Sequence, residues 1–212
     1  MPLTRRRFNQ FLVGGLSLAL APVTLAELRE GRDWRAISRP QSEAPEGKIE
    51  LLKFFSYGCP FCGQLNQVMK PWLEDLPEDV VFRRVPVSFN RSAWANLSRV
   101  YFALEATGEL ERLDQAVFDA IGQRRERLFT EQAIMDWMDD RDVDTERFAE
   151  AFHASRTQTL VARGDRLQSR FRINSVPTLV VDGRYVVVGE DARTYQDLLD
   201  ITEQLMDKAR AA

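Results

Sequence analysis

The stretch that decides the fold is Leu51-Leu52-Lys53-Phe54-Phe55-Ser56-Tyr57-Gly58-Cys59-Pro60-Phe61-Cys62, an apolar run that leads into two cysteines. The chain contains no other cysteine, so Cys59 and Cys62 can form one internal disulfide. A bridge across so few residues removes little loop entropy and stabilises a fold only slightly. A strand that feeds a Cys-x-x-Cys motif at the start of a helix is instead the arrangement that makes a thiol reactive. We therefore expect the pair to have a chemical role.

The first 26 residues are expected to be an export signal. Arginines at positions 5 to 7 precede an uncharged stretch from Phe11 to Leu25, and small residues around Ala26 offer a cleavage site. The Arg-Arg-x-Phe order also resembles a twin-arginine signal, so the export route stays open. The alternative is an uncleaved membrane anchor, which is disfavoured because the stretch is shorter than a span of ~20 residues and contains Gly and Ser.

The composition fits an exported globular protein. Cleavage after Ala26 leaves 186 of the 212 residues and moves the net charge from −3 to −6, because it removes three arginines and no acid. This acidic charge argues against a nucleic-acid partner, which would require a basic face. The length fits one domain, or one domain that carries an insertion. Exported bacterial proteins meet an oxidising environment, in which a Cys-x-x-Cys pair can persist as a disulfide.

Secondary-structure patterns divide the chain into a β-α-β segment, a block of helices and an α-β-β-α segment. Strands are expected over five stretches, residues 34–38, 49–56, 80–89, 178–181 and 185–188. Helices are expected over residues 59–76, several segments between 93 and 154, 157–171 and 194–208. Asp182-Gly183 supplies the turn of a hairpin between the last two strands.

With these features the chain resembles the thioredoxin superfamily, and within it the DsbA-like thiol oxidases. The resemblance is carried by residues 54–62, by Val176-Pro177-Thr178 before the hairpin, and by the helical block between them. It implies an α/β thioredoxin fold with an inserted all-helical domain. The thioredoxin-like domain would comprise residues 27–92 and 156–212, and the insertion residues 93–155. The resemblance also implies a cis Val176–Pro177 bond against the cysteine pair, where backbone is open to a substrate strand.

The physics of helix ends agrees with the roles that the resemblance implies. Free N–H groups and the helix dipole favour a thiolate at Cys59, the expected nucleophile. Such sites lower a thiol pKa from ~8.5 to about 3.5–7.5, a range whose low end comes from a DsbA enzyme. A more stable thiolate makes the disulfide a stronger oxidant. Cys62 is expected to be buried and to resolve the mixed disulfide. The residues expected to contact substrate are Pro60, Phe61, Val176 and Thr178.

Phe61 departs from the family pattern. The family commonly has His at this third position of the motif, and a phenyl ring can neither carry charge nor donate a hydrogen bond. We therefore expect Cys59 to be less acidic than in a Cys-Pro-His-Cys enzyme, and the protein to be a milder oxidant.

Lys53 is a second departure, because thioredoxin-like proteins usually place a buried acid six residues before the first cysteine. Arg84 on the next strand aligns with a usual cationic partner. Two buried cations repel, and burial lowers a lysine pKa. The hypothesis is that Lys53 is partly neutral and either accepts a proton from Cys62 or stabilises its thiolate. The alternative is that Lys53 reaches solvent and does neither.

Together these expectations describe an exported, periplasmic thiol:disulfide interchange protein that introduces disulfide bonds into reduced client proteins. Its redox centre is the Cys59–Cys62 disulfide. No separate cofactor or metal is expected, since two cysteines and the distant His153 cannot fill a zinc site. The resemblance implies re-oxidation by a quinone-linked membrane partner of the DsbB type. Two alternatives stay open, a reductase or isomerase kept reduced by another donor, and a peptide-binding chaperone whose disulfide is redox-inert. Val176 favours the oxidase, because Thr is frequent there in reducing members.

Overall fold

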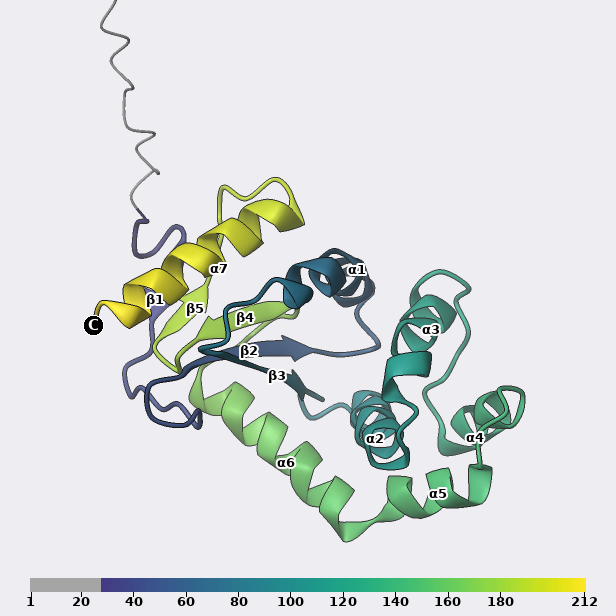
Figure 1. Cartoon of the computed structure of the whole chain (residues 1–212). Helices are drawn as coiled ribbons and strands as arrows, with labels where there is room; N and C mark the ends of the chain where they lie inside the picture. The colour runs from purple at the N-terminus through teal and green to yellow at the C-terminus, as the bar shows by residue number, and fades with distance from the viewer. Residues whose placement is uncertain (1–27) are drawn as a thin grey trace, which may run out of the picture.

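A five-stranded mixed sheet lies at the centre of the structure, a computed structural model that describes residues 28–212 (Figure 1). The strand order across the sheet is β1 (Trp34–Ala36), β5 (Tyr185–Val187), β4 (Thr178–Val181), β2 (Ile49–Phe55), β3 (Val80–Pro86). The β2–β3 pair is parallel and the other pairs are antiparallel. All residues of β2 are buried, which its apolar sequence requires of a central strand. The expected export signal, residues 1–26, lies outside the described residues.

The five expected strands are confirmed, and four of them end one to three residues earlier than expected. β3 ends at Pro86 rather than at Phe89. Phe89 and Asn90 have φ angles of 49° and 59°, which no extended strand can contain. The hairpin between β4 and β5 has positive φ at both Asp182 and Gly183, as the turn sequence predicts.

Helices cover both faces of the sheet. α1 (Pro60–Glu74) and α7 (Tyr195–Arg210) pack on one face, and α6 (Ser155–Arg170) on the other (Figure 1). Alternate residues of β2 point to opposite faces, so Leu51 joins the core beneath α1 and α7 while Leu52 joins the core over α6. Lys53 therefore shares the face of Leu51, toward α1.

The helical block is a second packed unit beside the sheet (Figure 1). Its helices are α2 (Ser92–Thr107), α3 (Leu110–Gly122), α4 (Glu131–Asp139) and α5 (Thr145–His153). α2 ends at Gly108, whose left-handed conformation is common just after the last turn of a helix. The apolar core of the block includes Phe55, Tyr57, Cys59 and Cys62, so the block packs directly against the cysteine motif. The proposed domain limits stay a prediction.

None of the helices found in residues 28–212 is both long enough and apolar enough to cross a bilayer.

Candidate active site

Cys59 lies at the N-cap of α1, directly before Pro60 at the first helical position. Proline suits this position because its missing N–H would have no partner within the helix. Both cysteines are free thiols, so the structure represents the reduced pair. Cys59 is 7% exposed, whereas Cys62, one turn into the helix, is fully buried. Only Cys59 is therefore accessible to another molecule.

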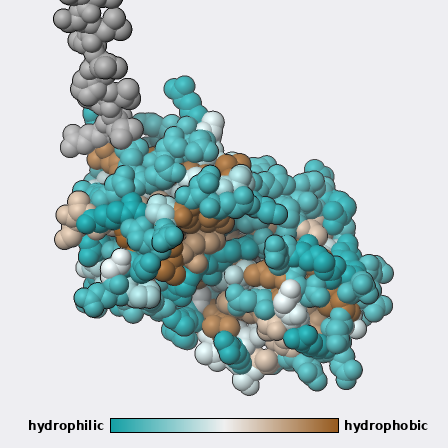
Figure 2. Space-filling view, in the orientation of Figure 1, coloured by the Kyte–Doolittle hydropathy of each residue, from teal (hydrophilic) through white to brown (hydrophobic). Residues whose placement is uncertain are grey.

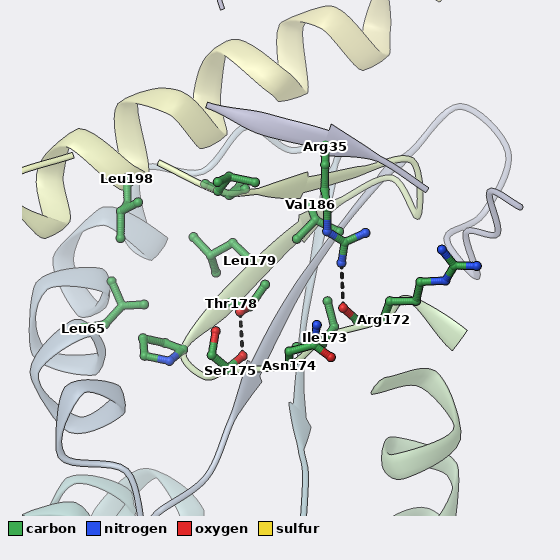
Figure 3. Close-up of a pocket in the computed structure, with 13 residues that line it drawn as sticks. Arg35, Leu65, Arg172, Ile173, Asn174, Ser175, Thr178, Leu179, Val186 and Leu198 are labelled. Atoms are coloured by element: carbon green, nitrogen blue, oxygen red, sulfur yellow. Dashed lines mark hydrogen bonds between the residues drawn. The ribbon is translucent and has the colours of Figure 1, made fainter. Parts of the chain in front are cut away.

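The cis-proline loop faces the accessible thiol. The Val176–Pro177 peptide bond is cis, the geometry that the resemblance implies. Cys59 Sγ lies 3.2 Å from the Val176 carbonyl oxygen and donates a hydrogen bond to it while the thiol is protonated. Thr178 Oγ1 donates to the Ser175 carbonyl oxygen at 2.8 Å, which fixes the end of the loop where β4 begins (Figure 3). Residues distant in sequence thus meet at the start of α1.

The two thiols have opposite pKa shifts. A hydrogen bond from Cys62 and the backbone N–H groups of Phe61 and Cys62 lower the pKa of Cys59 to about 6, although partial burial opposes them. Burial, and then the hydrogen bond to Cys59, raise the pKa of Cys62. At neutral pH the pair therefore holds a thiolate at Cys59 and a proton on Cys62.

Lys53 lies on β2 next to Cys62. It is 1% exposed, so the alternative that it reaches solvent is wrong. Its Nζ donates to Asn66 Oδ1 at 2.8 Å. Burial, and then repulsion from Arg84, lower the pKa of Lys53 to about 7, against the attraction of Asp114 and Cys62. A group with this pKa can bind or release a proton near neutral pH.

Asp114 completes the buried cluster, and the sequence did not point to it. Its Oδ1 lies 2.8 Å from Arg84 Nη2 and accepts a hydrogen bond from the Tyr57 hydroxyl at 2.7 Å. Its Oδ2 accepts from Asn66 Nδ2 at 2.9 Å. The carboxylate that β2 lacks is thus supplied by α3 of the helical block. Because an acid on an amphipathic helix is usually solvated, no sequence signal distinguished Asp114 from its neighbours.

Phe61 lies at the surface beside the thiol and is 61% exposed. It lines a shallow groove whose far wall is formed by Val188, Tyr195 and Leu198, and Pro60 is likewise exposed. Figure 2 shows hydrophobic residues in several separate places on a mostly hydrophilic surface, and the large apolar side chains exposed in residues 28–212 are Phe61 and Val188, both in this groove. An apolar surface therefore borders the reactive thiol.

A cavity of about 250 Å³ continues from the cis-proline loop, between β1, β5 and the start of α7 (Figure 3). One end is apolar and the other polar. The apolar end is formed by Leu65, Leu179 and Leu198. The polar end is formed by Arg35, Arg172, Asn174 and Ser175.

His153 does not join the site. It is exposed at the end of α5, where its Nε2 lies 3.0 Å from Glu131 Oε1. Within residues 28–212, no three His, Cys, Asp or Glu side chains are grouped to hold a metal ion.

Comparisons with known proteins agree with the site. The chain matches the DSBA-like thioredoxin domain over residues 50–200. It is 32% identical to the thiol:disulfide interchange protein DsbA of Burkholderia cepacia, over 91% of this chain and 89% of that protein. It is 34% identical to the protein of the same name from Bordetella parapertussis, over 90% of each. The crystal structure of Pseudomonas aeruginosa DsbA aligns with a TM-score of 0.81 at 29% identity, over 87% of this chain and 95% of that chain.

The matched segment includes the cysteine motif, the helical block and the cis-proline loop. The expected α/β thioredoxin fold with inserted helices is confirmed. The reactive thiol, its buried partner and the loop that faces them are arranged as thiol–disulfide exchange requires. The chain belongs to the DsbA-like thioredoxin domain family, whose relatives named here are thiol:disulfide interchange proteins.

Proposed function

We propose that this thiol:disulfide oxidoreductase introduces disulfide bonds into exported proteins, with Cys59 as the sulfur that exchanges with the client. The observation that carries the proposal is the contact of the Cys59 thiol with the Val176 carbonyl, 3.2 Å apart, at the one accessible cysteine. The lowered pKa of Cys59 supports oxidising strength, because stabilising the reduced thiolate favours reduction of the disulfide.

The exchange begins with the protein in its Cys59–Cys62 disulfide form. A client thiolate attacks Cys59 Sγ, the bond to Cys62 breaks, and Cys62 leaves with the electron pair as a thiolate. A second client thiol loses its proton and attacks the client sulfur of the mixed disulfide. Cys59 then leaves as a thiolate, the client gains a disulfide, and the protein holds two electrons more. In the reverse direction Cys62 resolves the mixed disulfide.

Lys53 is proposed to handle the proton of Cys62. The thiolate that Cys62 forms is buried, and burial favours its protonation. Lys53 is buried beside it and has a pKa of about 7, so the ammonium can donate the proton and the amine can take it back in the reverse step. Asn66 and Asp114 position Lys53 through a chain of hydrogen bonds at 2.8 and 2.9 Å.

The client is proposed to lie across the motif and the cis-proline loop. Pro60 and Phe61 are exposed on one side of Cys59, and Val176 and Thr178 are partly exposed on the other. Backbone groups of the loop would pair with an extended client segment, which is how peptides add to strand edges.

The reduced protein must be re-oxidised before it acts again. We propose that it passes its two electrons to a quinone-linked membrane oxidase of the DsbB type, and that both act in the periplasm. The redox centre needs no cofactor, since the Cys59–Cys62 pair itself carries the electrons.

The proposed function is tested by mixing stoichiometric oxidised protein with a reduced dithiol peptide and following peptide oxidation by chromatography. The wild type should oxidise the peptide, and Cys59→Ser should lose this activity. Equilibration with glutathione should give a reduction potential less negative than that of the cytosolic glutathione pool, which lies at about −220 mV or lower. A wild type that does not oxidise the peptide, or a potential near about −270 mV, would contradict the oxidase and favour the chaperone or the reductase respectively.

The role of Lys53 is tested by Lys53→Met, with Lys70→Met on the exposed side of α1 as the matched control. The first variant should slow a single turnover about tenfold near pH 7, less than the range usual for a general acid. The control should exchange at the wild-type rate. An unchanged rate together with an unchanged potential in Lys53→Met would remove Lys53 from the mechanism.

A further inference from the structure

Arg35 lies over the cavity that adjoins the cis-proline loop (Figure 3). Its Nη2 donates to the carbonyl oxygens of Phe171 and Arg172, at 2.6 and 2.9 Å. These carbonyls follow α6, where the negative end of the helix dipole favours a cation. One nitrogen satisfies this structural role, and across residues 28–212 no acceptor is found for Nε or Nη1. Two donor nitrogens of this partly exposed guanidinium therefore remain available to a ligand.

Arg172 adds a second positive charge at the same end of the cavity. It is exposed, and within the described part of the chain neither it nor Arg35 forms an ion pair with a carboxylate. Other arginines of the protein do, for example Arg83 with Glu50 and Arg210 with Asp79. Burial, and then the charge of Arg172, lower the pKa of Arg35, as expected of two cations without a neutralising acid.

The positive charge is local, because the chain as a whole is acidic, with a net charge of −3. An unneutralised pair of cations at the rim of a cavity attracts an anionic group and repels a cationic one. The opposite end of the cavity is formed by leucine side chains, which favour an apolar group. The cavity therefore fits a segment in which an apolar residue and an acidic residue lie close together.

The cavity is continuous with the reactive centre. Pro177 and Thr178 line it, and the Cys59 thiol contacts Val176, the residue before them. A client strand joined to Cys59 and lying along the loop would thus place a neighbouring side chain beside Arg35. An arginine can hold a carboxylate through two parallel hydrogen bonds.

We infer that Arg35 and Arg172 select client segments that carry Asp or Glu beside the reactive cysteine, with an adjacent apolar residue in the leucine-lined end of the cavity. This inference rests on the proposed function, because it needs a client strand on the cis-proline loop. It assigns these two arginines to substrate specificity and not to the exchange of sulfur bonds.

The test uses reduced dithiol peptides that differ in one residue, Glu, Gln or Lys, at each position flanking the cysteine. Second-order rates of oxidation by the oxidised protein are measured at low salt. At the position that reaches the cavity, the Glu peptide should react about tenfold faster than the Lys peptide, with Gln between them. Raising the salt to about 0.5 M should reduce this ratio.

Variants of single arginines show which residues cause the preference for the Glu peptide. Arg172→Gln should lower the Glu-to-Lys ratio about threefold, and Arg172→Glu should invert the preference. Arg35→Gln should also lower the ratio, and Arg35→Lys, which keeps the charge but loses the two parallel hydrogen bonds, should lower it less. Arg166→Gln, on the exposed side of α6, is the matched control and should keep the wild-type ratio.

The outcomes distinguish the two proposals. A ratio near one at every position, in a protein that oxidises all peptides well, would overturn the selectivity and leave the proposed function intact. An equal fall of the Glu-to-Lys rate ratio in Arg166→Gln and Arg172→Gln would also overturn the selectivity. The preference would then come from the overall charge of the surface and not from these two arginines. Failure to oxidise any peptide would instead refute the proposed function.

Discussion

The two sides of the Cys-x-x-Cys motif differ in the kind of residue that surrounds each sulfur. Outside, Cys59 is bordered by Phe61, which is 61% exposed, and by the backbone of the cis-proline loop. Inside, Cys62 is bordered by Lys53 and the charged cluster that Asp114 completes. The hydrogen bond from Cys62 and the backbone N–H groups of the helix start lower the pKa of Cys59. Burial, and then that same hydrogen bond, raise the pKa of Cys62.

The inner side of the motif also carries the larger cost in folding free energy, because it buries ionisable groups. Lys53, Arg84 and Asp114 are charged or ionisable groups removed from water, with hydrogen bonds from Tyr57 and Asn66. Removing the acid from such a cluster leaves buried cations unpaired and is costly, whereas apolar replacement of the whole set is often neutral or stabilising. Its position beneath the redox pair suits a role in moving protons.

Asp114→Asn should have the largest effect. It removes the single carboxylate that faces Arg84 and Asn66 and leaves two cations buried without a counter-charge. We expect the free energy of unfolding to fall by about 3–5 kcal/mol, the cost of breaking a buried pair by removing one partner. Urea denaturation of the oxidised protein measures this loss. Glu111→Gln, an exposed acid earlier on α3, is the control and should change stability little. A loss equal to that of the control would show that Arg84 finds another partner.

Lys53→Met should change stability in the opposite direction. The folded pKa of Lys53, about 7, lies below its ordinary value of 10.5, so the unfolded chain binds more protons between these values. The lysine therefore costs stability most at and below pH 7, and the cost fades as the pH rises toward 10.5. Methionine should raise the free energy of unfolding by about 1–4 kcal/mol at pH 7, because removing the pKa shift outweighs the lost hydrogen bond to Asn66, and by little near pH 10. Urea titrations at the two pH values measure the difference, which a lysine with an ordinary pKa would not produce.

The reduced pair should make stability depend on pH. The folded pKa of Cys59 is about 6 and its ordinary value 9.0, so the unfolded reduced chain binds more protons between these values. The stability of the reduced protein relative to the oxidised protein should rise by about 2 kcal/mol from pH 6 to pH 8. The raised pKa of Cys62 opposes this gain only above its ordinary value of 9.0. Parallel denaturation of both redox forms measures the difference, and a flat profile would contradict the thiolate at Cys59.

The outer side of the motif was predictable from the sequence because its parts have local signals. A buried apolar strand, the cysteine spacing and Pro60 fix the start of α1, and the family resemblance supplied the cis Val176–Pro177 contact. The hairpin turn followed from Asp182-Gly183, whose conformations depend on short-range sterics. The strand ends were less predictable, since Val87 to Phe89 continue an apolar pattern that the backbone leaves after Pro86.

The inner side was predictable only in part. The sequence indicated two cations, Lys53 and Arg84, and a lowered lysine pKa, because neighbouring strands of a β-α-β unit place them together. It gave no sign of Asp114 or Asn66, since each lies on an amphipathic helix where polar residues usually face water. Which helical acid turns inward depends on how the helical block packs against the sheet, and no local pattern encodes that arrangement.

Phe61→His should have the smallest effect and tests the outer side alone. The side chain at this position is exposed beside Cys59, so a protonated imidazole can attract the thiolate without disturbing the core. We expect the pKa of Cys59 to fall from about 6 by about one pH unit. That change corresponds to ~1.4 kcal/mol and raises the reduction potential by about 30 mV. Thiolate absorbance against pH and glutathione equilibration measure the two quantities, with Phe61→Leu as the control that should change neither. If the histidine and leucine variants have the same Cys59 pKa and the same reduction potential, residue 61 does not set the oxidising strength of the Cys-Pro-Phe-Cys motif. The inner cluster then sets the reduction potential instead.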